Sequence, residues 1–196
     1  MPSRLVAPLM VTLLIGALSA GSALAETEGW VVESGKSRAG FDAFHAWGNF
    51  SGASETPTGL VELDIEDLKK PIKGSLTVPV ASLRTGKRGR DNDLRRALDG
   101  ERHPEIRYRI DKVDSSFSSL AGNDVLMTIH GVLSMRGTER PVALMARARV
   151  REGTLWVRGE SRIRPADFGV PPLRIWLISM KEHVLATFDL VLSKAK

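Results

Sequence analysis

The sequence predicts a single all-β domain, either a sandwich or a closed barrel, with one short helix. Two observations lead to this prediction. Apolar and polar residues alternate with a period of two, the pattern of half-buried antiparallel strands, over residues 59–65, 72–80, 105–110, 124–133, 142–150, 154–163 and 183–192. Short turn sequences such as Gly122-Asn123-Asp124 and Glu152-Gly153 separate these runs. Many strands joined by short turns in one domain are typical of sandwiches and barrels.

The N-terminus has the three parts of a secretory signal peptide. Arg4 provides a positive charge, an apolar run follows, and Ala23-Leu24-Ala25 forms a small-x-small cleavage site. This pattern predicts that residues 1–25 are removed and that residues 26–196 form the mature, exported domain. A second apolar run of about 20 residues, as a membrane-spanning helix needs, is missing from that domain.

The composition of residues 26–196 excludes several classes of chemistry. The chain has no cysteine, so disulfides, thiol catalysis and cysteine-bound metals are excluded, and stability must come from packing. The formal net charge of the whole chain is +5, a mild excess that affects solubility more than it defines a partner.

One segment departs from the strand pattern. In residues 91–100, Leu94, Ala97 and Leu98 follow helical spacing, Asp91 or Asn92 is suited to cap the start, and Gly100 is suited to the C′ position after the end. Pro104 then prevents the helix from continuing. The prediction is a short amphipathic helix, basic on its outer side, that caps the β structure.

The basic stretch from Arg84 to Arg96 leaves two interpretations open. It lacks the G-x-x-x-x-G-K-[ST] pattern of a phosphate-binding loop. It also lacks stacking aromatics and contains acidic residues, which argues against nucleic-acid binding. A solvated face of the capping helix and a contact with anionic lipid headgroups both fit the charge pattern.

Catalytic and metal-binding patterns are missing from the sequence. His45, His103, His130 and His183 show neither H-x-x-x-H nor H-E-x-x-H spacing, and no G-x-S-x-G motif occurs. The sequence therefore predicts a protein that is not an enzyme and that has no metal site and no cofactor.

Four segments in order resemble the YceI-like family of lipocalin-like, polyisoprenoid-binding periplasmic proteins. They are the Trp-led opening in residues 29–47, a Thr-Gly and helix segment ending in Pro-x-Ile-x-aromatic in residues 84–108, a Gly-x-Leu-x-x-x-Gly hairpin in residues 129–144, and a strand ending in Asp-Phe-Gly in residues 159–170. The resemblance implies an eight-stranded antiparallel lipocalin-like barrel with a short capping helix. It also implies an isoprenoid or similar amphiphilic lipid in the interior.

The predicted ligand-binding residues are apolar side chains of the barrel interior and its mouth. Small residues at Gly74, Ala146, Ala148, Gly159 and Ala186 are expected to keep a tunnel open, although a solid core is the alternative. The predicted set is Phe41, Phe44, Trp47, Phe50, Leu76, Val78, Ile106, Tyr108, Met127, Ile129, Leu144, Ala146, Phe168, Leu173, Trp176 and Phe188.

Two functions are weighed on these grounds, beside a third, a hydrolase or isomerase on the same barrel, for which the expected catalytic patterns are missing. The first is a periplasmic protein that carries or sequesters an isoprenoid-type lipid in a hydrophobic barrel cavity. The second is an envelope stress or interaction protein with a filled barrel, whose basic helix binds a partner or an anionic membrane. Neither involves nucleic acid, and a homodimer is left open.

Overall fold

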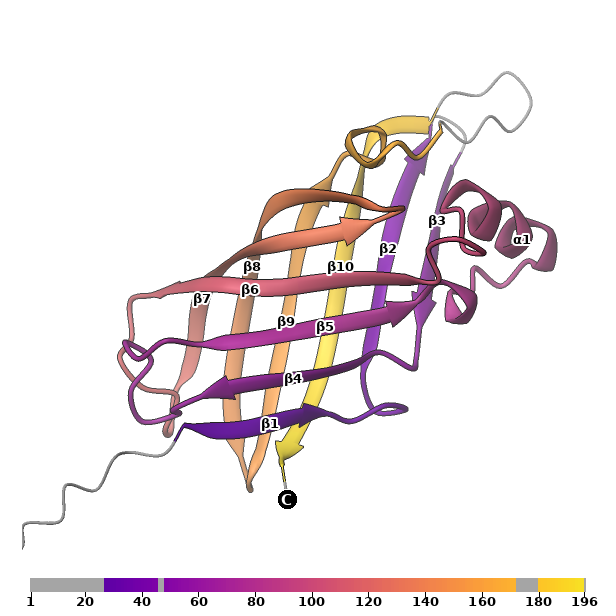
Figure 1. Cartoon of the computed structure of the whole chain (residues 1–196). Helices are drawn as coiled ribbons and strands as arrows, with labels where there is room; N and C mark the ends of the chain where they lie inside the picture. The colour runs from indigo at the N-terminus through magenta and orange to yellow at the C-terminus, as the bar shows by residue number, and fades with distance from the viewer. Residues whose placement is uncertain (1–26, 46–47, 172–179, 196) are drawn as a thin grey trace, which may run out of the picture.

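The computed structural model describes residues 27–45, 48–171 and 180–195, which form one β-sheet, one α-helix and two short 3₁₀ helices (Figure 1). In chain order the elements are β1 (Glu28–Val32), β2 (Arg38–His45), β3 (Gly48–Ser54), β4 (Thr58–Leu63), β5 (Lys73–Pro79), η1 (Val80–Ser82), α1 (Arg88–Ala97), β6 (Glu105–Ser115), β7 (Asp124–Met135), β8 (Thr138–Arg151), β9 (Thr154–Ile163), η2 (Pro165–Phe168) and β10 (Met180–Lys194).

Eight of the strands close into an antiparallel barrel. Going round the ring, the order is β1-β4-β5-β6-β7-β8-β9-β10, and the pairing of β1 with β10 closes it within the described chain. Strand β10 is long enough to pair with two strands along one edge. Its residues 192–194 pair with β1, and its residues 180–189 pair with β2. The eight-stranded barrel with a short helix is therefore confirmed.

Strands β2 and β3 form a hairpin outside this ring, which the sequence pattern did not predict. β2 pairs with β10, and β3 pairs with β2. Ala53 in β3 and Arg84, just before α1, exchange two backbone hydrogen bonds of 2.9 Å each. The hairpin and the segment that leads into α1 therefore complete the barrel wall at the end where the helix lies (Figure 1).

Apolar side chains pack into two clusters along the barrel. One cluster includes Trp30, Leu120 and Leu155, and Trp30 is fully buried. The other, toward the helix, includes Leu94 from α1 and Leu98 directly after it. Burying such side chains contributes about 1.5–3 kcal/mol each, which lets this cysteine-free chain fold by packing alone. No helix in the described ranges is both long and apolar enough to cross a membrane.

Helix α1 differs from the prediction at both ends. It begins at Arg88, before the predicted caps, because Asp91 accepts hydrogen bonds from Thr85 and does not cap the helix. At the other end, Asp99 takes the left-handed conformation (φ 52°), and the N–H of Gly100 bonds to the carbonyl of Arg95 at 2.9 Å. This is a Schellman ending, in which Asp99 occupies the C′ position that was predicted for Gly100.

Candidate functional site

An apolar cavity with a volume of about 390 Å³ lies at the helix end of the barrel. Phe41 and Phe50 line it from the β2–β3 hairpin, Val78 from β5, Ile106 from β6 and Leu94 from α1. Its volume falls within the range of about 300–1,000 Å³ that is typical of small-molecule pockets. We call it the outer chamber.

Two charged residues in the lining of the outer chamber form an ion pair with each other. Arg164, just before η2, and Glu182 on β10 both line the chamber, and a guanidinium nitrogen of Arg164 lies 3.6 Å from a carboxylate oxygen of Glu182. Glu182 is exposed to solvent. The chamber thus combines an apolar interior with charged groups that reach water, an arrangement suited to an amphiphile.

Two aromatic rings form one wall of the outer chamber, and an arginine packs against one of them. Phe41 and Phe50 meet edge to face, with ring centroids 6.0 Å apart. The guanidinium carbon of Arg90 in α1 lies 4.4 Å from the centroid of the Phe50 ring, which is a cation–π contact. Arg90 also donates to the hydroxyl and the carbonyl of Thr85. Arg90 therefore holds the start of α1 against the hairpin.

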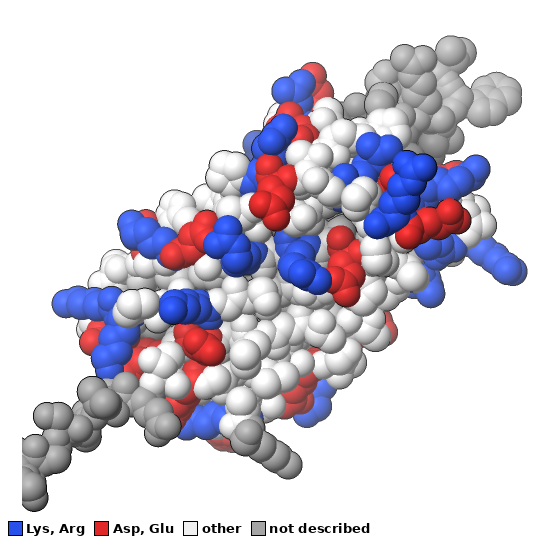
Figure 2. Space-filling view, viewed as in Figure 1, with Lys and Arg blue, Asp and Glu red and all other residues white. Residues whose placement is uncertain are grey.

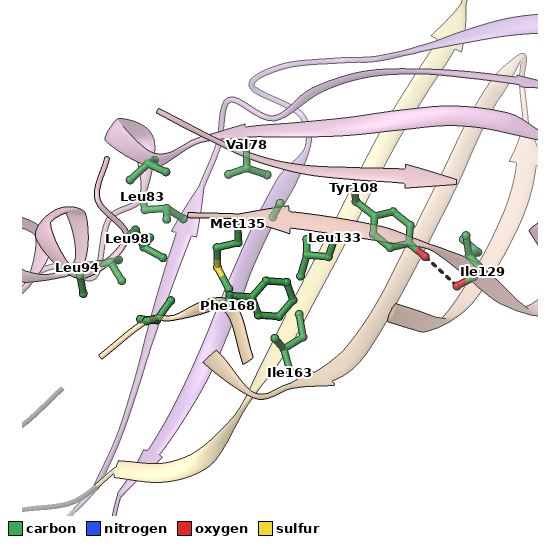
Figure 3. Close-up of a cluster of buried hydrophobic side chains, with 14 of the residues drawn as sticks. Val78, Leu83, Leu94, Leu98, Tyr108, Ile129, Leu133, Met135, Ile163 and Phe168 are labelled. Atoms are coloured by element: carbon green, nitrogen blue, oxygen red, sulfur yellow. Dashed lines mark hydrogen bonds between the residues drawn. The ribbon is translucent and has the colours of Figure 1, made fainter. Parts of the chain in front are cut away.

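A buried carboxylate in the same helical turn also binds Thr85. Asp91 accepts a hydrogen bond of 2.7 Å from the N–H of Thr85 and one of 2.6 Å from its hydroxyl. These bonds to the charged form lower the pKa of Asp91, so the carboxylate is ionised at neutral pH. With α1 held in this way, Leu94 and Leu98 are directed into the cluster beneath it (Figure 3).

A second, smaller cavity of about 150 Å³ lies deeper in the barrel. Its walls are apolar side chains of the cluster around Trp30 together with residues of the middle of the barrel, among them Leu63, Met127, Ile129, Leu144 and Leu192. We call it the inner chamber. Its volume is below the range expected for a complete ligand pocket.

Six residues line both chambers and form a partition between them: Leu76, Tyr108, Leu133, Ile163, Ala186 and Phe188. Tyr108 comes from β6 and Phe188 from β10, which are opposite one another in the ring. The hydroxyl of Tyr108 lies 3.0 Å from the carbonyl oxygens of Ile129 and Val142 (the first is dashed in Figure 3). Burial raises the pKa of Tyr108 above its usual range, so the phenol keeps its proton and donates it.

Gly159, one of the small residues expected to keep a tunnel open, instead makes room for an aromatic ring, whereas Ala186 of the same set lines both chambers. A Cβ on Gly159 would lie 2.4 Å from the Phe188 ring, and a Cβ on Gly131 would lie 2.7 Å from the Tyr108 ring. Because these two glycines have no side chain, the two aromatic rings of the partition can pack directly against the strands there. Open space remains on either side of it.

The predicted site residues fall into four groups. Phe41, Phe50, Leu76, Val78, Ile106, Tyr108 and Phe188 line the outer chamber. Met127, Ile129 and Leu144 line the inner one. Ala146 and Phe168 are buried in the core without lining either chamber, and Phe44 is half-buried on β2, also outside both linings. Trp47, Leu173 and Trp176 lie outside the described residues. A role in ligand binding stays a prediction for all of them.

Sequence reasoning missed the contribution of the helix to the chamber wall. Leu94 and Leu98 line the outer chamber, as do Leu83 before α1 and Val170 after η2. The apolar spacing of Leu94 and Leu98 marked a buried helix face, but it did not indicate that this face lies on a cavity. That depends on the position of the hairpin across from it.

A closed antiparallel barrel that surrounds apolar chambers defines the class of lipocalin-like barrels. The chain belongs to the YceI-like domain family, whose model matches residues 30–192.

Solved structures support the same fold. The chain is similar to BcnA of Burkholderia cenocepacia, with 18% identity and a TM-score of 0.69 over 82% of this chain and 98% of that one. It is also similar to a polyisoprenoid binding domain from Saccharophagus degradans, with 12% identity and a TM-score of 0.66 over 87% and 100%. A YCEI protein of Campylobacter jejuni matches with 17% identity and a TM-score of 0.62 over 76% and 86%. A comparison with curated proteins found no match.

Proposed function

We propose that this protein is exported to the periplasm and binds an isoprenoid-type lipid in its barrel, as a carrier or sequestering protein and not as an enzyme. The observation that carries the proposal is the apolar outer chamber of about 390 Å³, with charged groups at Arg164 and Glu182. The signal-peptide pattern of residues 1–25 supports export. The similarity to a structure described as a polyisoprenoid binding domain supports the ligand class.

The chemistry of the chamber suits a prenyl chain. A prenyl chain offers no hydrogen-bonding groups, and the walls of the outer chamber are mostly aliphatic and aromatic side chains. Transfer of such a chain from water gains about 0.8 kcal/mol per buried CH₂, before the loss of its conformational freedom is counted. A polar head left beside Arg164 and Glu182 would stay in contact with water.

Binding is expected to be detectable in two ways. Protein purified after expression of the full 196-residue chain should release prenyl species into organic solvent, as identified by mass spectrometry. Added farnesol at about a hundred times its dissociation constant should raise the free energy of unfolding by about 2.7 kcal/mol. An extract without prenyl species, combined with no stabilisation by farnesol, would contradict the proposal.

A matched pair of variants locates the ligand. Ala43 is buried and lines the outer chamber, whereas Ala143 is exposed on the outer face of β8. Ala43→Leu should reduce the stabilisation by farnesol because the added methyl groups occupy space in the chamber. Ala143→Leu makes the same chemical change on the outside and should leave the stabilisation unchanged.

A second candidate function is contact with an anionic membrane or partner through α1. Residues 84–102 contain seven Lys or Arg and four Asp or Glu, and basic side chains gather over α1 at one end of the molecule (Figure 2). Lys87 and Arg88 are exposed. Arg90 is engaged with Phe50 and Thr85, so the exposed basic surface is smaller than the sequence indicates.

This candidate predicts salt-sensitive association with vesicles that contain anionic lipid. Lys87→Gln with Arg88→Gln should weaken it by about 1 kcal/mol per charge, as measured by vesicle co-sedimentation. The control removes two exposed charges away from α1, namely Lys73, the first residue of β5, and Arg151, the last residue of β8. Equal weakening by both pairs would exclude a specific role for the helix. A homodimer stays a separate prediction, which analytical ultracentrifugation of the same preparation tests.

A further inference from the structure

We infer that Tyr108 and Phe188 set the length of the prenyl chain that the barrel accepts. In this partition the Tyr108 side chain keeps its position and the Phe188 side chain moves. This inference rests on the proposed function and adds a specificity to it. It follows from the two rings that line both chambers from opposite walls.

Tyr108 is held in place from two sides. Its hydroxyl lies within hydrogen-bond distance of carbonyl oxygens on β7, the next strand, and on β8, two strands away, and its ring lies in the space left by Gly131. Only 7% of the residue is exposed. Moving this ring would leave its buried hydroxyl without an acceptor, which is unfavourable. Tyr108 therefore stays in the partition whether or not a ligand is present.

Phe188 has no such anchor. Its ring carries no polar atom, is half-buried, and packs into the space left by Gly159. It borders free volume on both sides, about 390 Å³ toward the helix and about 150 Å³ toward Trp30. A rotation of its side chain breaks no hydrogen bond and has room in which to occur.

The partition therefore divides ligands by length. A short prenyl chain fits within the outer chamber and leaves the rings in place. A longer chain has to displace Phe188 to reach the inner chamber, and this opposes the gain from burying more of the chain. Affinity should rise with chain length until the outer chamber is filled and should then stop rising.

The experiment measures the affinity of geraniol, farnesol, geranylgeraniol and solanesol for protein purified from the full chain, by competition with a fluorescent fatty acid. For the unmodified protein, affinity should rise along the first members of the series and then level off or fall. Phe188→Ala should move this limit to a longer alcohol and strengthen the binding of that alcohol about tenfold. Phe188→Leu retains more of the core packing and should move the limit in the same direction by less.

Phe41→Ala is the matched control, because Phe41 is an aromatic residue that lines the outer chamber without lining the inner one. It should weaken the binding of every alcohol and leave the limit where it is. Identical length profiles for the unmodified protein, Phe188→Ala and Phe188→Leu would overturn the inference while the proposed function stands. If the unmodified protein binds none of the alcohols, the proposed function fails and the inference fails with it.

Discussion

Replacing Trp30 with alanine is expected to lower the free energy of unfolding by about 3–5 kcal/mol, the range for removal of a buried aromatic side chain. Trp30 lies on β1, is fully buried, and belongs to the cluster at the end of the barrel away from α1. Its backbone is at the seam of the ring, since it is paired with Val61 of β4 on one side and Lys194 of β10 on the other. The substitution therefore opens a cavity next to the closure of the barrel.

Urea unfolding followed by circular dichroism measures this change. Val31→Ala is the control, because Val31 is the next residue on the same strand and its side chain is 41% exposed on the outer face. That variant should remain within about 0.5 kcal/mol of the unmodified protein. A loss at Trp30 that is no greater than the loss at Val31 would show that the closed end does not depend on this packing.

The second large effect is expected at Gly131, where alanine should lower the free energy of unfolding by about 1–3 kcal/mol through overpacking. A Cβ there would lie 2.1 Å from the carbonyl oxygen of Arg109 and 2.7 Å from the Tyr108 ring. The strand or the ring would have to move, and a displaced ring would lose its hydrogen bonds to Ile129 and Val142. Urea unfolding again provides the measurement.

Replacing Gly89 with alanine is expected to change the free energy of unfolding in the opposite direction. It lies in the first turn of α1 at an ordinary helical position, and a Cβ there would meet no other atom within 4 Å. Gly89→Ala should therefore raise the free energy of unfolding by about 0.5–1 kcal/mol, because alanine loses less conformational freedom in a helix. If both glycine substitutions destabilise the protein equally, the clash with the partition is not the cause of the loss at Gly131.

The strands of the barrel were predictable from local pattern. In β7, Val125, Ile129 and Leu133 are spaced an even number of positions apart and so lie on one face, and these three side chains are buried as the period of two requires. Where the pattern was weak the prediction was incomplete. Residues 38–45 and 48–54 are rich in glycine, alanine and serine in place of a regular apolar row, and they form β2 and β3 beside β10, which is long enough to pair with both β1 and β2.

Local sequence patterns were enough to identify a cysteine-free all-β domain with one amphipathic helix, because alternation and helical spacing are properties of neighbouring residues. Its apolar interior positions could also be identified. Which of these positions fill space and which border a cavity is seen only in the folded barrel. Phe188 meets Gly159 across the β9–β10 pairing, and Tyr108 reaches the carbonyl of Val142 two strands away. Such contacts depend on register and on ring closure, and these bring together residues that are far apart in the chain.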